Sequence, residues 1–480
     1  MLNDEVRQKT AKGFLWVSIY VGGARILQAA TFLILGKLLE PEDFGAFALA
    51  MVLVNGLIML REIGLTPALI QIRDDVDRAF RNSAVMLPFF GVLVFFVIFL
   101  IAPVYGRLAA NESVVPIVKV LGLMAPLSSF GILPAVYLQR NLRFRKKALP
   151  EILSVTVGSG LSVFLAWQGF GVWSFIYGIL STEFIRTTAY WITVGFKFKP
   201  QVDFAVWKRL LKFGVQVSIG STFGFLYTLV DRFIVGTHFI IEQLGYYSFS
   251  LQLANLLPNN LVLISNQLIL PTLSSMQDEK QKFIRTYSLG LALFALIIIP
   301  VSAGIYLFGG DLLHWLYNNK WDDAALALKI FVFYGFSRAI GALNTEVFLS
   351  KGKPKYFTFL SAGKLLFCLL ALPFVLRFDK MEAVAILFTF GLLAMTVMSF
   401  FLAAKLMEMK FWGIIKIFIP HIISIIAGCG AIFSLPNEML LLRIALFYAV
   451  YAGTQFIFNR RFLASVKEFT TALLKKGEQD

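Results

Sequence analysis

The sequence predicts an all-α integral membrane protein with about 14 transmembrane helices, and three observations carry this prediction. Hydrophobic residues make up 58% of the 480 residues and charged residues only 15%, whereas soluble domains carry about 45–50% apolar and about 25% charged residues. Apolar runs of helical length recur along the whole chain. Lysines and arginines gather in every second connection between these runs.

Each predicted span is a run of roughly 20 apolar residues, the length that a helix needs to cross a bilayer core about 30 Å thick. The first half of the chain holds the runs 13–35, 44–63, 84–103, 114–135, 149–168, 171–194 and 211–235. The second half holds the runs 244–272, 287–308, 325–349, 357–376, 383–404, 411–433 and 437–457. The first run is longer than a signal-peptide core of roughly 7–15 residues, so we expect it to be retained.

The basic residues predict the topology. One set of alternate connections contains 30 lysines and arginines, and the other set contains 5. By the positive-inside rule the richer set faces the cytoplasm, together with both termini. The cluster R-N-L-R-F-R-K-K, from Arg140 to Lys147, is then a cytoplasmic anchor between the fourth and fifth spans, with attraction of anionic lipid headgroups as a second interpretation. Topology also explains the net charge of +16, which therefore does not indicate nucleic-acid binding.

The two halves of the chain contain a repeat with an offset of 200 residues. L-I-L-G-K-L-L-E-P-E-D-F-G-A-F, starting at Leu33, aligns without a gap with F-I-V-G-T-H-F-I-I-E-Q-L-G-Y-Y, starting at Phe233, so that Gly45 matches Gly245. Six spans separate the copies, which predicts a parallel repeat about an axis along the membrane normal and a central cavity suited to alternating access. We expect a six-helix N-terminal lobe (1–200), a six-helix C-terminal lobe (201–404), and two extra helices with a cytoplasmic tail (405–480).

Several cations lie inside the predicted spans, where a charge costs about 2.5–3.5 kcal/mol on insertion scales. Such side chains usually face a partner or a water-filled cavity, and the planar guanidinium suits phosphate oxygens. We therefore predict a cationic cavity for an anionic substrate, formed by Arg25, Arg186, Arg338, Lys364 and Arg232. For Arg186 an alternative stays open, because Glu183 precedes it by three residues and the two could form a structural ion pair.

Acids and amides inside the spans complete the predicted site. The candidate coupling or gating acids are Glu183, Asp231 and Glu62. The candidate lining amides, whose side chains could hydrogen-bond sugar hydroxyls, are Asn55, Asn255, Asn259 and Gln252. Pro258 is expected to interrupt the helix that carries three of these amides, which would place it against a cavity. Interhelical hydrogen bonding is the alternative role of the amides.

Other functional classes have little support in the sequence. The three histidines are far apart and the two cysteines have no metal-ligand spacing, so we expect no metal and no cofactor other than a coupling H⁺ or Na⁺. The longest connections are roughly twenty residues, and no P-loop pattern is present, so a nucleotide-binding domain has no place. The triplet Asp75-Val76-Asp77 leaves a membrane glycosyltransferase or polymerase as a weak alternative, although it lies in a solvated charge run.

The motifs resemble those of a known family. G-K-L-L-E-P-E-D-F-G-A-F, from Gly36, resembles the signature G-x-x-L-x-P-x-D-[FY]-G of polysaccharide exporters. Three further stretches are similar to the same group: Asp231–Ala254, I-L-P-T-L-S-S-M-Q-D from Ile269, and L-R-F-R-K-K-A-L-P-E-I followed by G-F-G-V-W-S. The resemblance is to Wzx-type flippases in the polysaccharide-synthase branch of the multidrug/oligosaccharidyl-lipid/polysaccharide exporter superfamily, and it covers nearly the whole chain.

This resemblance implies a transporter, not an enzyme, that moves undecaprenyl-pyrophosphate-linked oligosaccharide from the cytoplasmic to the periplasmic leaflet of the bacterial inner membrane. The pathway would be the synthesis of O-antigen, capsule or exopolysaccharide. The implied partners are the lipid-linked substrate, membrane lipids, and a polymerase with other assembly proteins. A multidrug or small-cation antiporter on the same scaffold is the alternative, and the excess of arginine over acid inside the membrane argues against it.

Overall fold

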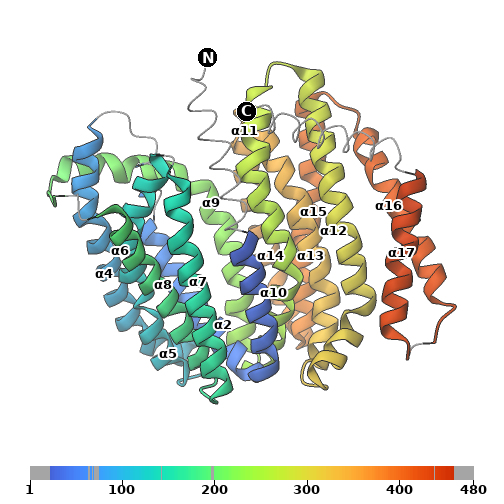
Figure 1. Cartoon of the computed structure of the whole chain (residues 1–480), viewed down its shortest axis with the longest axis horizontal. Coiled ribbons are helices and arrows are strands. Elements are labelled where there is room, and N and C mark those ends of the chain that lie inside the picture. Colours follow the sequence, from blue (N-terminus) through green and yellow to red (C-terminus); the bar gives the residue numbers. More distant parts are fainter. Residues whose placement is uncertain are drawn as a thin grey trace. The chain divides into compact units, whose positions relative to one another are not determined.

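In this computed structural model the chain is described at residues 22–62, 65, 66, 69, 75–141, 143–195, 199–436 and 438–458. The side chains of residues 60–62, 144 and 213–221 are left out of the description. Over these ranges the secondary structure is helical, with no strand (Figure 1). The predicted all-α membrane fold is thereby confirmed.

The chain divides into two compact units, Met1–Ser248 and Phe249–Asp480. Unit 1 contains the helix at 22–38, α2 (Pro41–Glu62), α4 (Val76–Leu108), α5 (Val114–Leu121), α6 (Met124–Arg140), α7 (Phe144–Trp167), α8 (Trp173–Val194), α9 (Phe204–His238) and the start of α10 (Ile241–Ile264). Unit 2 contains the rest of α10, then η1 (Ser265–Ile269), α11 (Leu270–Ser275), α12 (Lys280–Tyr317), η2 (Asp322–Ala324), α13 (Ala325–Ser350), α14 (Lys355–Val375), η3 (Leu376–Phe378), α15 (Met381–Met407), α16 (Phe411–Ile432) and α17 (Leu440–Phe458).

Where the structure describes them, the predicted apolar runs fall on these helices; residues 13–21 of the first run lie outside the described residues. Within the described ranges, 11 helices are long and apolar enough to cross a membrane, so the chain is a multi-pass membrane protein. The count of fourteen spans and the internal repeat stay predictions, as do the lobe boundaries. The run expected at 114–135 is the broken pair α5 and α6, and the run expected at 244–272 covers α10, η1 and α11.

Small residues let α7 and α8 pack closely in unit 1, where the two helices lie side by side (Figure 1). A Cβ added at Gly158 would fall onto the hydroxyl of Thr182, and one added at Gly178 would fall onto the hydroxyl of Ser162. Small residues at such crossings let helix backbones approach, which is how helices associate in lipid without a hydrophobic driving force.

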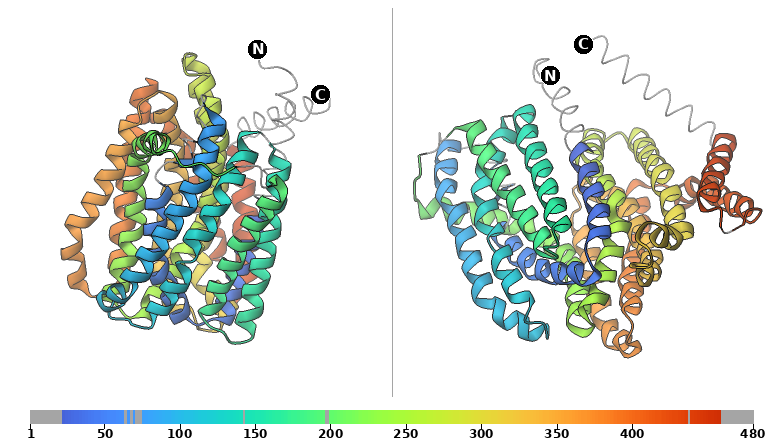
Figure 2. Two further views of the ribbon diagram at one scale, coloured as in Figure 1. Left: turned by 90° about the vertical axis from the view of Figure 1, so that its left-hand side faces the viewer. Right: turned by 60° about the horizontal axis from the view of Figure 1, so that its bottom comes forward.

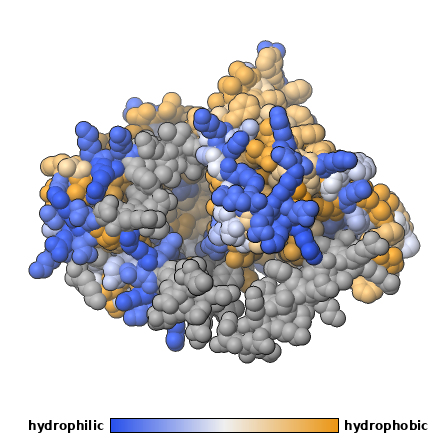
Figure 3. Space-filling view, turned by 90° about the horizontal axis from the view of Figure 1, so that it is seen from above, coloured by the Kyte–Doolittle hydropathy of each residue, from blue (hydrophilic) through white to orange (hydrophobic). Residues whose placement is uncertain are grey.

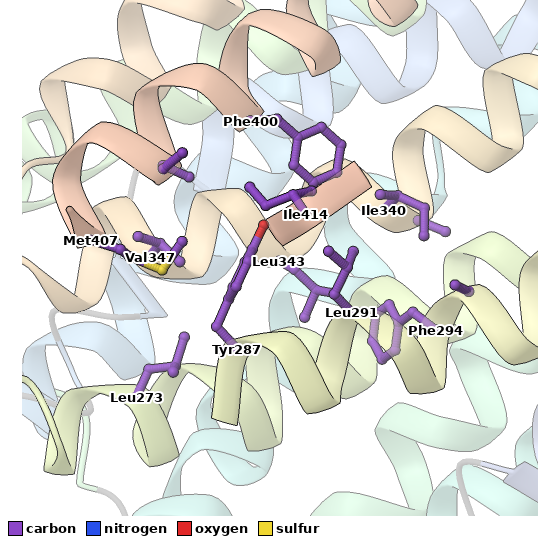
Figure 4. Close-up of a cluster of buried hydrophobic side chains, with 14 of the residues drawn as sticks. Leu273, Tyr287, Leu291, Phe294, Ile340, Leu343, Val347, Phe400, Met407 and Ile414 are labelled. Atoms are coloured by element: carbon purple, nitrogen blue, oxygen red, sulfur yellow. The ribbon is translucent and has the colours of Figure 1, made fainter. Parts of the chain in front are cut away.

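The core of unit 2 is a hydrophobic cluster on α12, α13 and α15, with contributions from α10, α11, α14 and α16 (Figure 4). Its labelled members include Tyr287, Leu343 and Phe400. Beside it, α16 and α17 form a helical pair (Figure 2). A buried polar group holds this pair together, because His421 Nδ1 lies 2.6 Å from the Tyr451 hydroxyl and 3.0 Å from Gln455 Nε2.

The connections predicted to be cytoplasmic contact one another within each unit. In unit 1, Arg78 at the start of α4 bonds Asp203 at 2.5 Å, and Asp203 also caps α9 by accepting the N–H of Ala205. In unit 2, Lys280 pairs with Glu408. Hydrophilic side chains gather on the end of the molecule seen in Figure 3. These contacts bring segments more than a hundred residues apart to the same end of their unit.

Candidate functional site

A cluster of charged side chains in unit 1 surrounds Arg186 on α8. Its guanidinium bonds the Glu183 carboxylate one turn earlier, and its Nη1 lies 3.6 Å from Glu151 Oε2 on α7. The Tyr190 hydroxyl donates a hydrogen bond to Glu151 Oε1 at 2.5 Å. Lys147 lies close enough to interact electrostatically with both Glu151 and Arg186. The close packing of α7 and α8 brings these residues together.

This cluster is balanced in charge, with two acids set against two cations. The Arg186 side chain keeps 28% of its surface exposed, so the pairs are partly solvated and contribute little to stability, about 0–1 kcal/mol. An anionic ligand at Arg186 would compete with two carboxylates. The Glu183–Arg186 pair considered from the sequence is present, whereas Glu151 and Tyr190 lie on other turns and were missed.

Arg25 lies on the first helix and is exposed. Its Nη1 donates to Gln28 Oε1 over 3.2 Å, one turn further along. No described acidic side chain forms an ion pair with it. The role of Arg25 in binding stays a prediction.

Two cations come together in unit 2. Arg338 on α13 and Lys364 on α14 are both half-buried, and they are near enough that each charge disfavours the other. Like charges held close inside a low-dielectric region are costly unless something negative joins them. Of the predicted cations that the structure describes, Arg338 and Lys364 are the two whose positive charges act on each other.

Asp231 and Arg232 lie near the end of α9, and their surroundings differ. Asp231 is 2% exposed, and its carboxylate accepts the backbone N–H of Arg232 at 2.8 Å and the Tyr247 hydroxyl at 3.3 Å. Arg232 is half-buried, and its Nε lacks a hydrogen-bond partner among the described atoms. Asp231 is thus held by α9 and the start of α10 in unit 1, where it could accept a proton. The side chain of Glu62 lies outside the described residues.

The predicted amides on α10 have different environments. Asn255 is 4% exposed; its Nδ2 donates to the Leu251 carbonyl at 2.8 Å, while its Oδ1 has no partner among the described atoms. Asn259 is half-buried and Gln252 is exposed. Asn55, on α2, is half-buried. Spacings of three and four residues put Gln252, Asn255 and Asn259 on one face of the helix.

The expected break at Pro258 is wrong, because α10 runs through this residue to Ile264. Proline lacks an N–H and leaves the carbonyl four residues earlier without its helical donor. That carbonyl, on Ala254, is covered by α13, where a Cβ added at Gly335 would fall onto it and onto Pro258. The irregularity comes instead at Ser265–Ile269, which form a π-helix.

An apolar pocket of about 190 Å³ lies in unit 2, next to the part of α10 that contains Pro258. It is lined by Leu253, Ala254, Leu256, Leu257, Pro258, Ile298, Val301, Ser302, Ile305 and Val332. These residues come from α10, α12 and α13, and almost all are aliphatic. The pocket can hold hydrocarbon but offers no charge to an ionic ligand. No group of three His, Cys, Asp or Glu that could hold a metal ion occurs in the parts of the chain described above.

The chain is similar in sequence to proteins that are already known. The succinoglycan biosynthesis transport protein ExoT of Rhizobium meliloti (strain 1021) is 26% identical over 321 residues, which cover 64% of this chain and 63% of ExoT. The lipopolysaccharide biosynthesis protein WzxC of Escherichia coli (strain K12) is 21% identical over 354 residues, covering 72% of this chain and 71% of WzxC. The match thus spans just under two thirds of ExoT.

Solved structures show the fold. The lipid II flippase MurJ, in an inward closed conformation, superposes with a TM-score of 0.72 at 16% identity, covering 94% of this chain and 100% of MurJ. An inward-facing multidrug resistance transporter of the MATE family in the MOP superfamily gives 0.63 at 16% identity, covering 80% of this chain and 94% of that protein. At such identities the likeness is one of fold.

The sequence motifs, the fold and the comparisons agree. A model of the family described as polysaccharide biosynthesis protein matches residues 34–326, which is more than half of the chain. This match confirms the resemblance to polysaccharide exporters that the motifs around Gly36 and Ile269 predict. The chain belongs to the polysaccharide biosynthesis protein family.

Proposed function

We propose that this protein is a flippase that carries undecaprenyl-pyrophosphate-linked oligosaccharide from the cytoplasmic to the periplasmic leaflet of the bacterial inner membrane. ExoT is named as a succinoglycan biosynthesis transport protein, WzxC as a lipopolysaccharide biosynthesis protein, and MurJ as a lipid II flippase. The protein is a transporter that makes and breaks no covalent bond. Its substrate would pass on to a polymerase and other assembly proteins.

The pair Arg338 and Lys364 is the observation that carries the proposal. Two half-buried cations from neighbouring helices repel each other, and a pyrophosphate supplies the negative charge that would relieve this repulsion. Arg338 would bind phosphate oxygens through its planar fork, and Lys364 would act as a point charge. The amides on α10 would face the sugars, and the prenyl tail would stay in hydrocarbon.

The topology and mechanism belong to the same proposal. The bias of basic residues favours cytoplasmic termini. Two lobes that open to alternate sides would carry the head group across. A multidrug antiporter shares the fold, as the MATE likeness indicates, but cationic drugs would be repelled by Arg338 and Lys364. The charge of the site therefore favours the anionic lipid as substrate.

Purified protein in liposomes that contain a defined lipid-linked oligosaccharide tests the proposal, with each leaflet assayed by a membrane-impermeant sugar-modifying enzyme. Hydrogen bonds to charged groups contribute about 1.5–3 kcal/mol, so Arg338→Ala should slow transfer roughly 10–150-fold. Lys364→Ala should act in the same direction, and Arg338→Lys should recover part of the rate. The matched control is Arg285→Ala, which removes an exposed cation from α12.

Normal transfer by well-folded Arg338→Ala and Lys364→Ala would remove the phosphate-binding assignment. Absence of transfer by the wild-type protein, together with export of cationic dyes, would favour the antiporter. Equal loss in all three alanine variants would show a general effect of charge removal on folding.

A further inference from the structure

Glu346, on α13, is a fully buried carboxylate in unit 2, with 0% of its surface exposed. Its neighbours along the helix, Leu343 and Val347, belong to the hydrophobic cluster shown in Figure 4. Neither Oε1 nor Oε2 makes a hydrogen bond with any described atom. Glu346 lies within the predicted span 325–349, but no residue pattern in the sequence indicated that its carboxylate would lack a hydrogen-bond partner.

One polar group lies beside this carboxylate, the hydroxyl of Ser265. Ser265 begins the π-helix η1, which packs against α13, and its hydroxyl is buried and also lacks a hydrogen bond among the described residues. Single turns of π-helix are frequent at functional sites. Two buried polar groups thus lie next to each other, and neither meets the geometry of a hydrogen bond.

The ionisable side chains on the surrounding helices are engaged elsewhere. The Tyr287 hydroxyl of α12 donates to Asn344 Oδ1 at 2.6 Å, and Asn344 Nδ2 donates to Ser399 on α15 at 2.7 Å. Lys351, one turn after Glu346, donates to the Gln277 carbonyl and lies 4.5 Å from the centre of the Phe283 ring.

The more distant charges have other neighbours as well. Lys280 at the start of α12 pairs with Glu408 at the end of α15. Arg338, two turns before Glu346, interacts electrostatically with Lys364 of α14. Within the described part of the chain, no cationic side chain is therefore directed at the Glu346 carboxylate.

An ionised carboxylate in such surroundings is strongly unfavourable, and a buried group of this kind takes up a cation or is neutralised. A metal cation needs several oxygen ligands, whereas the described residues supply one carboxylate and one hydroxyl. A proton needs a single oxygen, and the resulting O–H has Ser265 as an acceptor. We propose that Glu346 is a proton-binding site of this transporter, filled when η1 packs on α13 and emptied when that contact opens to water.

This inference rests on the proposed transport function for its physiological role, but its chemistry can be tested without substrate. The infrared C=O stretch of a protonated carboxylic acid should be present at neutral pH in the wild-type protein. Glu346→Gln should remove the part of this band that comes from Glu346, since glutamine has nearly the same shape and cannot hold the proton, and Asp231→Asn would remove any contribution of the buried Asp231. The control Glu112→Gln, which changes an exposed acid in unit 1, should leave it in place. Ser265→Ala should keep the band and shift its frequency.

Transport provides the second measurement. In proteoliposomes with a pH gradient, wild-type protein should move lipid-linked oligosaccharide faster than without the gradient, and Glu346→Gln should lose this stimulation while retaining transfer without a gradient. A protonated-acid band of unchanged intensity in Glu346→Gln would overturn the proposal, and so would stimulation by a sodium gradient alone. If the wild-type protein shows the band but transfers no lipid, the proton site stands and the proposed substrate falls.

Discussion

The first turns of α2 and α10 meet at two glycines, and replacing one of them tests how this contact controls the transporter. A Cβ built on Gly45 would fall onto the carbonyl oxygen of Ile241 and close to the amide nitrogen of Gly245. A Cβ on Gly245 would fall onto the carbonyl group of Pro41. All four residues lie in unit 1, so the two helix starts pack backbone against backbone within one compact unit.

The contact is reciprocal, because residue 45 meets residue 241 and residue 245 meets residue 41. Each partner lies 200 positions from its counterpart, which is the offset of the predicted repeat. Surfaces related by a two-fold axis meet in this reciprocal way. In the predicted topology both turns lie on the periplasmic side, so we expect the contact to close that side before the substrate is released.

The free-energy cost of a substitution at Gly45 depends on the kind of atoms that the new side chain would contact. Overpacking costs about 1–3 kcal/mol, and we take the upper value for Gly45→Ala because backbone atoms cannot rotate away. Alanine also gains about 1 kcal/mol of helix propensity, but α2 is helical in the open and the closed form, so this gain cancels in the ratio between them. The overpacking cost of about 3 kcal/mol should therefore raise the ratio of open to closed contact about 150-fold.

Cysteine labelling measures this ratio. Leu39 is 2% exposed and lies just before α2, so Leu39→Cys in a background without Cys368 and Cys429 should react slowly with a maleimide. Gly45→Ala should raise the labelling rate about 150-fold while the open form stays the minor one. The control is Gly56→Ala on the same helix, whose Cβ would lie 3.3 Å from Leu229 Cδ1, a side-chain atom that can move. Equal rates in the two variants would refute the reasoning.

Two further predictions concern stability. The pKa of Glu408 lies below its usual range, mainly because Lys280 donates a hydrogen bond to the carboxylate and also because of the positive charge on Lys280. The pair therefore stabilises the folded protein at pH values above the ordinary glutamate pKa of about 4.3. This stabilisation is lost as the pH falls through the lowered pKa. The melting-temperature difference between wild type and Glu408→Gln should therefore be present at neutral pH and vanish in acid; a constant difference would contradict this. His421→Leu leaves the buried Tyr451 hydroxyl without its partner and should cost about 1–3 kcal/mol in thermal unfolding, whereas Ile422→Leu, on an exposed position of the same helix, should have little effect.

The helices could be predicted because each span must satisfy its backbone internally and bury about 20 apolar residues, which leaves a plain signal in the sequence. The irregularities within the helices could not be predicted from the sequence. Proline suggested a break at Pro258, yet α13 supplies a glycine that covers the freed carbonyl there. The π-helix at Ser265–Ile269 follows from packing against α13, which no local pattern records.

The charged residues show the same limit. The Glu183–Arg186 contact was open to prediction because both residues lie on one helix, three positions apart. Glu151 joins Arg186 only because α7 and α8 pack together, and the sequence separation of 35 residues carries no sign of it. Arg338 and Lys364 were each recognised as membrane-buried cations, but their proximity depends on how α13 and α14 lie. Sequence therefore identified candidate charges, and tertiary packing determined which of them have partners.

The proposed phosphate-binding residue Arg338 and the proposed proton site Glu346 lie on one helix, so the energy that couples the two sites can be estimated. Arg338 and Glu346 are eight residues apart on α13, which is about 12 Å along the helix axis. When the proton leaves Glu346, a negative charge appears at that distance from the cation that would hold the pyrophosphate. A phosphate held by Arg338 would lie at about the same distance from Glu346, and at an effective dielectric constant of about 20 the carboxylate would repel one phosphate charge by about 1.4 kcal/mol. That energy corresponds to about a tenfold loss of phosphate affinity, so proton release and substrate release would favour each other, as reciprocal linkage requires.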